Sequence, residues 1–359
     1  MEYTVLHTNP AAARVSAGAL LAPASPERAR LMIAAIAGAL AVLVGGCGPT
    51  SFLVTPVPGD QALREHVVRR EGLLAFHKVA VVDIEGVLRN SRPASLLGGE
   101  RDNPVVVLKE KLDRAAADAR VRAVVLRINS PGGGVTASDI MYSELMAFRQ
   151  RTRKPVVASL MDVAASGGYY LACAADEIHA QPTTVTGSIG VIMIAPEFSG
   201  TMHKLGIEAN VIKSGPLKDA GSPLRSMTPE DRAVFQSLID AMYERFVAVV
   251  TAGRKGVEPA RLRELADGRV YLAPQARELG LVDEVGSLDG ALRRAKVLAG
   301  LGDRPVLVVE YARRIDRRPN IYAESPAPGS VQVNLLNVTL PELLTAGAPE
   351  FMYLWAPGW

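Results

Sequence analysis

The sequence has few cysteines, few histidines and few aromatic residues, and each shortage narrows the possible functions. Only two of the 359 residues are cysteines, Cys47 and Cys173, so at most one disulfide is possible. The five histidines are scattered, and none stands at metal-ligand spacing, so we expect neither a metal nor a cofactor. The formal net charge of +3 is close to neutral, and it indicates no surface for nucleic acid.

A hydrophobic run of spanning length is also missing at the N-terminus, although a shorter one is present. Residues 31–46 form an uncharged stretch of 16 residues, whereas a spanning helix needs about 20. Arg28 and Arg30 precede this stretch, as in an export signal. The stretch ends in Val-Gly-Gly before Cys47, which resembles a bacterial lipobox with Cys47 as the lipidated residue. The alternative is an uncleaved signal anchor. Both place the body on the extracytoplasmic face of the membrane.

The body of the chain alternates short β-branched runs with helical patterns. Continuous apolar strands between amphipathic helices favour an α/β fold with a mainly parallel sheet covered on both faces. We expect one copy of this unit over residues 76–300, after a tail and signal segment (1–46) and a linker (47–75). The expected strands are 78–84, 122–128, 155–160, 177–180 and 189–192, and the expected helices are 104–118, 137–151, 166–176 and 228–252.

The C-terminal extension, residues 301–359, departs in composition and its role is open. It contains one further strand pattern, residues 306–311, and then a proline-rich stretch. One interpretation is that the tail docks on its own domain or on a neighbouring subunit. The other is that its aromatic residues touch the membrane interface. These residues are Phe351, Tyr353, Trp355 and Trp359.

Two glycine-rich segments follow expected strands and suggest a site at the ends of those strands. In residues 126–135, LRINSPGGGV, consecutive glycines let backbone N–H groups point into a site. A phosphate loop is the rival, but the required lysine spacing is missing, and a plain turn is the simplest alternative. In residues 161–170, Ser166 stands among small residues, as a nucleophile on a tight strand-to-helix turn requires. A serine at a helix start is more often only an N-cap.

A third segment, residues 212–231, is a long polar loop that contains Lys213 and Lys218. A surface lysine is usually a solvated charge. Near a serine and away from water, its pKa falls and it can act as a base.

Together these segments resemble the bacterial signal peptide peptidase A family, serine–lysine proteases with a Clp-protease/crotonase-like fold. The matching strings are INSPGG, AASGGYY, TVTGSIGV, KSGPLKDAGSPLRSMTPED and ADGRVY, in the order and spacing of the short, single-copy members. The resemblance covers roughly residues 78–300. It implies a membrane-associated serine endopeptidase that degrades cleaved signal peptides and other short apolar or unfolded peptides near the membrane.

The resemblance also implies a role for individual residues. The nucleophile falls on Ser166 and the general base on Lys218, which we prefer to Lys213 because it matches the Lys-Asp pair of the motif. Ser188 would position the lysine, and the amides of Gly133 and Gly167 would form the oxyanion hole. In single-copy members the serine and lysine come together across neighbouring protomers of a ring, so we expect a homo-oligomer.

Three rival interpretations share the fold. A Ser-His-Asp protease would need a histidine after the nucleophile, and His179 stands inside an expected strand. A crotonase-type acyl-CoA enzyme usually uses carboxylates and would not be exported. An inactive membrane scaffold would not need the intact serine, lysine and glycines.

Overall fold

The computed structural model describes residues 62–90, 103–313 and 350–355, and all of them belong to one compact unit. The expected lipidation site Cys47 and the hydrophobic stretch before it lie outside the described residues. Among the residues that are described, no helix is both long and apolar enough to cross a membrane.

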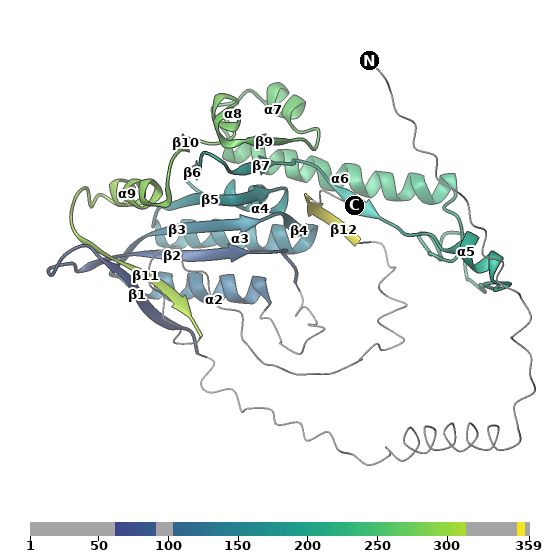
Figure 1. Ribbon diagram of the computed structural model, residues 1–359, viewed down its shortest axis with the longest axis horizontal. Coiled ribbons are helices and arrows are strands. Elements are labelled where there is room, and N and C mark those ends of the chain that lie inside the picture. Colours follow the sequence, from purple (N-terminus) through teal and green to yellow (C-terminus); the bar gives the residue numbers. More distant parts are fainter. Residues whose placement is uncertain (1–61, 91–102, 314–349, 356–359) are drawn as a thin grey trace, which may run out of the picture. The chain divides into compact units, whose positions relative to one another are not determined.

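A nine-stranded sheet forms the centre of this unit (Figure 1). Its main path runs in the order β1-β11-β2-β3-β5-β6-β10, and all neighbours from β11 to β10 are parallel. Only β1 on β11 and β9 on β7 pair antiparallel. The bounds are β1 Arg64–Arg70, β2 His77–Glu85, β3 Val121–Ser130, β5 Val156–Ala165, β6 Glu177–Ala180, β7 Val185–Gly187, β9 Val270–Leu272, β10 Glu284–Val285 and β11 Val306–Ala312. The predicted α/β fold with a mainly parallel sheet is confirmed.

The central strands are buried on both faces, which explains their continuous apolar sequence. In β2, Ala80 and Val82 face the larger core, whereas Val79 and Val81 face a smaller one. Leu288 and Leu292 of α9 (Leu288–Leu298) cover the smaller core. The larger core includes residues of α2 (Pro104–Ala117), α3 (Val135–Thr152), α4 (Gly167–Ala172) and α6 (Pro229–Gly253).

Helix α6 begins where its sequence predicts. Thr228 accepts a hydrogen bond from the N–H of Asp231, and the Asp231 carboxylate accepts one from the N–H of Thr228. This capping box satisfies two N–H groups that have no partner within the helix. The remaining helices are short: α5 Ser199–Lys204, α7 Pro259–Leu265 and α8 Ala273–Glu278.

A second, three-stranded sheet joins segments far apart in the sequence. Its order is β4-β12-β8, with bounds β4 Gly132–Gly134, β8 Ile192–Ile194 and β12 Glu350–Leu354. Both pairings are antiparallel. The C-terminal strand therefore docks on its own unit, the first of the two interpretations offered for the tail. Trp359 lies outside the described residues.

Several sequence-based boundaries differ from the structure. The strand expected at 189–192 begins only at Ile192, and β7 precedes it. The helix expected over 166–176 is the six-residue α4, because it ends in a tight turn at Cys173. The main sheet also reaches beyond the expected 76–300 unit, since β1 and β11 pair with each other and β11 pairs with β2.

Candidate active site

Ser166 stands in the turn between β5 and α4, in a backbone conformation that is costly for a residue with a side chain. Its φ is 51° and its ψ is −116°. The turn is held by the Ser166 N–H, which donates to the Gly187 carbonyl at 2.7 Å, and by its carbonyl, which accepts from Tyr170 N–H at 2.8 Å. The Ser166 side chain makes no N-cap hydrogen bond to α4. A strained residue whose hydroxyl does not cap its helix fits a chemical role better than a structural one.

Small residues are required beside Ser166 because backbone from other strands lies close to it. A Cβ on Gly168 would lie 2.6 Å from the Ser130 carbonyl oxygen. A Cβ on Gly167 would lie 3.1 Å from the Cα of Gly132. The two glycine-rich segments of the sequence therefore meet at one point.

Ser188 lies beside Ser166 at the end of the neighbouring strand. Strands β5 and β7 are parallel, and Ala165 is the register partner of Gly187. The two serines each follow this pair, and both have a φ of 51°. Adjacent strands are about 4.8 Å apart. The predicted nucleophile and the predicted lysine-positioning hydroxyl therefore stand at neighbouring positions.

Gly133 turns its backbone polar groups away from Leu88 and toward β12. On one edge of β4, Leu88 N–H donates to the Gly132 carbonyl at 2.9 Å, and its carbonyl accepts from Gly134 N–H at 2.8 Å. Polar groups of successive residues point to opposite edges of a strand, so those of Gly133 face the other edge. There the register partner of Gly133 is Tyr353.

The Tyr353 carbonyl oxygen lies where Gly133 and Gly167 converge. A Cβ on Gly132 would overlap this oxygen, and one on Gly167 would lie 3.1 Å from it. The Tyr353 carbonyl oxygen therefore lies against Gly132 and Gly167, and Tyr353 is the register partner of Gly133.

Lys218 is not brought to this group in the single chain. It lies in a segment that we call the arm, residues 195–231, which contains α5 and reaches the start of α6 (Figure 1). Lys218 is exposed, and no hydrogen bond or ion pair of its amine is found among the described residues. Within that same part of the chain, the arm's side-chain and turn hydrogen bonds stay between residues 197 and 232.

An ionic network holds the arm together around Asp219, the residue after Lys218. Asp219 pairs with Lys213 at 2.7 Å and with Arg225 at 2.9 Å. Arg225 in turn pairs with Asp231, the buried capping residue of α6. The hydrogen bonds from Arg225 and Lys213 hold the pKa of Asp219 well below its usual range. The Arg225 hydrogen bond and the Thr228 N–H lower the pKa of Asp231 to about 2. In the described part of the chain, Lys213 thus pairs with Asp219, whereas no partner of the Lys218 amine is found.

Comparison with known proteins adds independent information. Residues 148–302 match the model of Peptidase family S49. A Synechocystis protein named "Putative protease slr0021" is 33% identical over 284 residues, which cover 77% of this chain and 96% of that protein. "Putative signal peptide peptidase SppA" of Enterococcus faecium is 38% identical, over 65% of this chain and 67% of that protein. "Serine protease SPPA, chloroplastic" of Arabidopsis thaliana is 35% identical, over 60% and 32%.

The chain belongs to peptidase family S49. It is therefore a serine-type endopeptidase with the expected Clp-protease/crotonase-like fold. The resemblance to the signal peptide peptidase A family is confirmed, and the acyl-CoA and scaffold interpretations are not needed.

Residues of this S49 peptidase that sequence reasoning left without a role also shape the site. The Ser130 hydroxyl donates to the Gly86 carbonyl at 2.6 Å and accepts from Gly132 N–H at 3.1 Å. These two bonds fix the backbone at the start of β4. Ser130 could have been singled out from the sequence, because it is the serine of the INSPGG string. Leu88 also holds β4, through its backbone N–H and carbonyl. Because these are backbone contacts, the identity of residue 88 gives no sign of them in the sequence.

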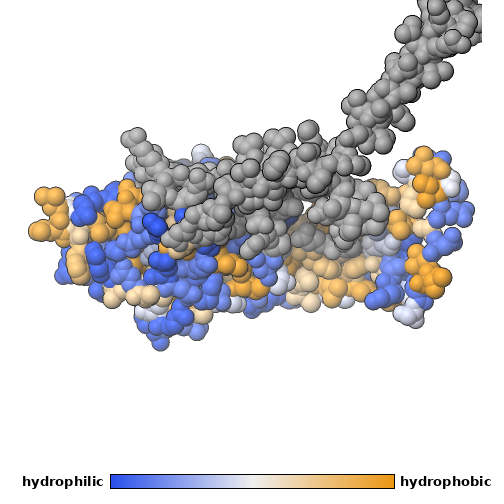
Figure 2. All heavy atoms as spheres, turned by 90° about the horizontal axis from the view of Figure 1, so that it is seen from below, coloured by the Kyte–Doolittle hydropathy of each residue, from blue (hydrophilic) through white to orange (hydrophobic). Residues whose placement is uncertain are grey.

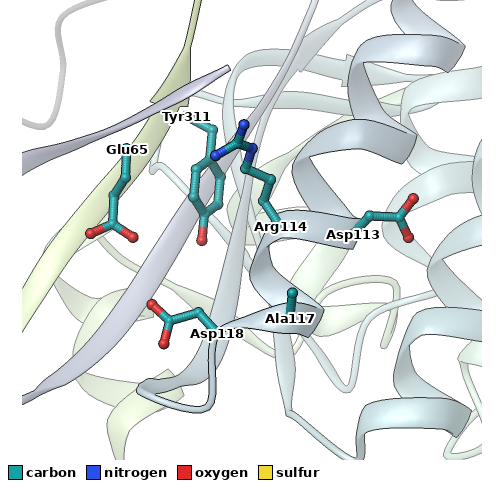
Figure 3. A pocket seen from close by; sticks show the side chains of 6 residues that line it. All are labelled: Glu65, Asp113, Arg114, Ala117, Asp118 and Tyr311. Atoms are coloured by element: carbon teal, nitrogen blue, oxygen red, sulfur yellow. The ribbon is translucent and has the colours of Figure 1, made fainter. Parts of the chain in front are cut away.

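Other candidate groups lie apart from the site. His179 is buried in β6 and contacts Glu177 at 3.3 Å. Cys173 is a buried free thiol whose pKa burial raises to about 12, so it is not a reactive thiolate. Figure 3 shows a cavity lined by Glu65, Asp113, Arg114, Ala117, Asp118 and Tyr311, none of which belongs to the peptidase site.

Proposed function

We propose that Ser166 is the nucleophile of this endopeptidase, that Lys218 of a neighbouring copy is its general base, and that Ser188 orients the lysine. The observation that carries the proposal is the Tyr353 carbonyl oxygen, which lies against Gly132 and Gly167, the residue after Ser166, while Gly133 is the register partner of Tyr353. A peptide carbonyl in that position receives the Ser166 oxygen while the two amides stabilise the resulting charge. Lys218 takes the serine proton and then passes it to the leaving amine.

The geometry of the arm supports a site shared between copies. Lys218 belongs to a segment with its own ionic network, whereas Ser166 lies in the main body. The arm also exposes apolar side chains, and Figure 2 shows apolar groups at the end of the molecule that carries it. They are Phe198, Leu205, Ile207, Val211, Ile212, Leu217 and Leu224. Exposed apolar side chains gathered in one segment favour contact with another protein surface. A homo-oligomeric ring would cover it and would bring Lys218 to the Ser166 of the next copy.

The lysine must be desolvated to serve as a base at neutral pH. In the single chain the Lys218 side chain is exposed to solvent. Burial at a subunit contact would remove it from water. The same contact would therefore assemble the dyad and activate it.

A membrane location is supported by a second apolar surface. Leu73 and Leu74 are 95% and 90% exposed in the turn between β1 and β2, and Phe76 is 61% exposed with Arg120 above its ring. Leucines and an aromatic ring beside a cation suit a membrane interface. With the N-terminal anchor, at Cys47 or as an uncleaved signal helix, this turn would hold the body on the extracytoplasmic face. Cleaved signal peptides and other apolar peptides partition into the same layer, so they are the proposed substrates.

A fluorophosphonate label on Ser166 tests the central proposal. The full-length oligomer should be labelled at Ser166, and labelling should be lost in Ser166→Ala and strongly reduced in Lys218→Ala. Lys213→Ala is the matched control and should retain labelling. Absence of labelling at Ser166 in well-folded oligomer, or equal labelling of Lys218→Ala and wild type, would contradict the proposed dyad.

A further inference from the structure

One peptide group lies between the two serines of the proposed site. Its carbonyl, that of Gly187, accepts a hydrogen bond from the Ser166 N–H at 2.7 Å. Its N–H, that of Ser188, donates to the Arg269 carbonyl at 2.8 Å. The C=O and the N–H of a trans peptide group lie in one plane and point in opposite directions. A single chain of hydrogen bonds therefore runs from Ser166 through this peptide group to Arg269.

The backbone of Ser188 depends on this chain more than the backbone of Ser166 does. Both serines have a φ of 51°, a conformation that persists only where the surrounding structure holds it. The turn at Ser166 is also held by its carbonyl, which accepts from the Tyr170 N–H. Among the described residues, the Arg269 carbonyl is the one partner found for the Ser188 N–H. A displacement of Arg269 would therefore act mainly on Ser188.

Strand β9 packs directly against the peptide group that precedes Ser188. β9 lies beside β7, and Val270 is the register partner of Gly187 (Figure 1). A Cβ on Gly187 would lie 2.7 Å from the Tyr271 ring and 3.2 Å from the Arg269 carbonyl oxygen. With no side chain between them, a movement of β9 would pass directly to Ser188.

Asp267 holds the backbone of Arg269 just before β9. Its carboxylate accepts from the Arg269 backbone N–H at 3.1 Å and from the Arg269 Nε at 2.8 Å. The side chain of Arg269, and then its backbone N–H, lower the pKa of Asp267 below its usual value. Gly268 between the two residues has a φ of 90°, which allows the tight turn. One carboxylate thus ties both the backbone and the side chain of the residue whose carbonyl holds Ser188.

The simplest alternative is a solvated ion pair on the surface. The side chains of Asp267 and Arg269 are 41% and 64% exposed, and exposed pairs contribute little to stability. A surface pair does not, however, require the bond from the backbone N–H of Arg269. The low contribution to stability is also useful, because changes at Asp267 can affect activity without unfolding the protein.

We propose that Asp267 is a positioning residue: through the Arg269 carbonyl, it holds the Ser188 backbone where the reaction needs it. This inference rests on the proposed function, in which the Ser188 hydroxyl orients the lysine. Asp267 touches neither the substrate nor the reacting atoms. The inference also gives a role to the string ADGRVY, which contains the turn and the start of β9.

Asp267→Ala in the full-length oligomer tests the inference. Without the carboxylate the Arg269 backbone loses its partner, so kcat for a reporter peptide should fall about tenfold with little change in KM. Asp267→Asn keeps an oxygen that can accept the Arg269 N–H and should recover most of the rate. The denaturant midpoint of both variants should stay near that of the wild type. A wild-type kcat in Asp267→Ala would overturn the inference.

Glu244→Ala is the matched control. Glu244 forms a comparably exposed ion pair with Arg263, at 2.6 Å, and this pair has no bond to either serine of the site. The variant should keep kcat near the wild-type value. A loss in Glu244→Ala as large as that in Asp267→Ala would mean that breaking any surface pair nearby is enough, and it would overturn the inference.

A double variant separates positioning from a general defect. Ser188→Ala removes the hydroxyl through which Asp267 acts, so adding Asp267→Ala to it should lower kcat by less than about twofold more. Independent defects would multiply, so a further tenfold loss would overturn the inference.

Two outcomes distinguish this inference from the proposed function. A fully active Ser188→Ala protein would overturn the route through Ser188, and this inference with it, while Ser166 could still be labelled by a fluorophosphonate. Absence of labelling at Ser166 in the well-folded wild-type oligomer would overturn the proposed function itself.

Discussion

The serine side and the lysine side of the proposed site are built in opposite ways. Around Ser166, backbone packs against backbone so closely that Gly132, Gly167 and Gly168 leave no room for a Cβ. The arm around Lys218 is open: its glycines at 200, 206 and 215 have no atom within 4 Å of an added Cβ. One half is fixed by close packing and the other by ion pairs.

This difference suggests a division of labour. A nucleophile and an oxyanion hole must hold their geometry before substrate arrives, and close packing provides that. A base that works only after assembly can sit on a segment that is stable by itself and finds its place at a subunit contact. In the proposed site, the serine half is held by close packing, and the lysine half would be completed at a subunit contact.

The largest expected effect comes from inactivating the serine half and the lysine half in two separate variants. Ser166→Ala and Lys218→Ala should each lower peptide hydrolysis by about a thousandfold or more. If the halves meet between copies, co-expressing the two variants should restore about one quarter of the sites by random pairing. Hydrolysis of a reporter peptide by purified mixed oligomers measures this. No recovery in mixed oligomers of normal size would place both residues of the dyad in one chain.

A glycine comparison tests the packing of each half. Gly132→Ala adds a Cβ that overlaps the Tyr353 carbonyl at a φ of 101°, and we expect a loss of about 2–4 kcal/mol in unfolding free energy. Gly215→Ala in the arm should change it by less than about 0.5 kcal/mol. Denaturant unfolding of both variants measures the contrast. Similar losses of unfolding free energy in Gly132→Ala and Gly215→Ala would contradict the difference in packing between the serine half and the lysine half.

The ionic network offers a smaller, more specific perturbation. Arg225→Gln leaves Asp219 and Asp231 without their shared partner and should lower kcat about tenfold by misplacing Lys218. Fluorophosphonate labelling of Ser166 with an excess of reagent should reach the same final extent as in the wild type. Arg225→Lys should recover part of the rate, which a purely structural defect elsewhere would not predict. An unchanged kcat would show that the network does not position the base.

Acid should loosen the arm before the body. The Asp231 pKa is lowered from 3.8 to about 2 in the folded protein, so its stabilising contribution is complete above pH 3.8 and is lost as the pH falls toward 2. Hydrogen exchange of amides at the start of α6 should therefore increase between pH 4 and 2, ahead of β5. Simultaneous exposure of both segments would contradict the independent arm.

Much of the fold was predictable because its signals are local. The apolar runs that became β2, β3 and β5 and the Thr228 cap of α6 depend on neighbouring residues only. The strand predicted at 189–192 starts later in the structure, because the chain turns at Ser188 with a positive φ. No pattern of side chains in the sequence indicates this turn.

The site was predictable in part. Gly167 and Ser188 could be assigned by resemblance, and the structure places them near Ser166. The packing of Tyr353 against Tyr170 and Phe246 could not be foreseen, because it joins residues more than 100 positions apart in the sequence. The assignment of Lys218 remains a prediction, because its proposed partner surface would lie on another copy of the chain.

The backbone of Ser166 has a practical consequence. Glycine accepts a φ of 51° at little cost, whereas any other residue there stays strained. Replacing the proposed nucleophile with glycine should therefore give a protein that does not cleave peptides and yet is harder to unfold than the wild type, by about 1 kcal/mol. For trapping bound peptides, Ser166→Gly is a better choice than Ser166→Ala, which keeps the strain and loses the chemistry.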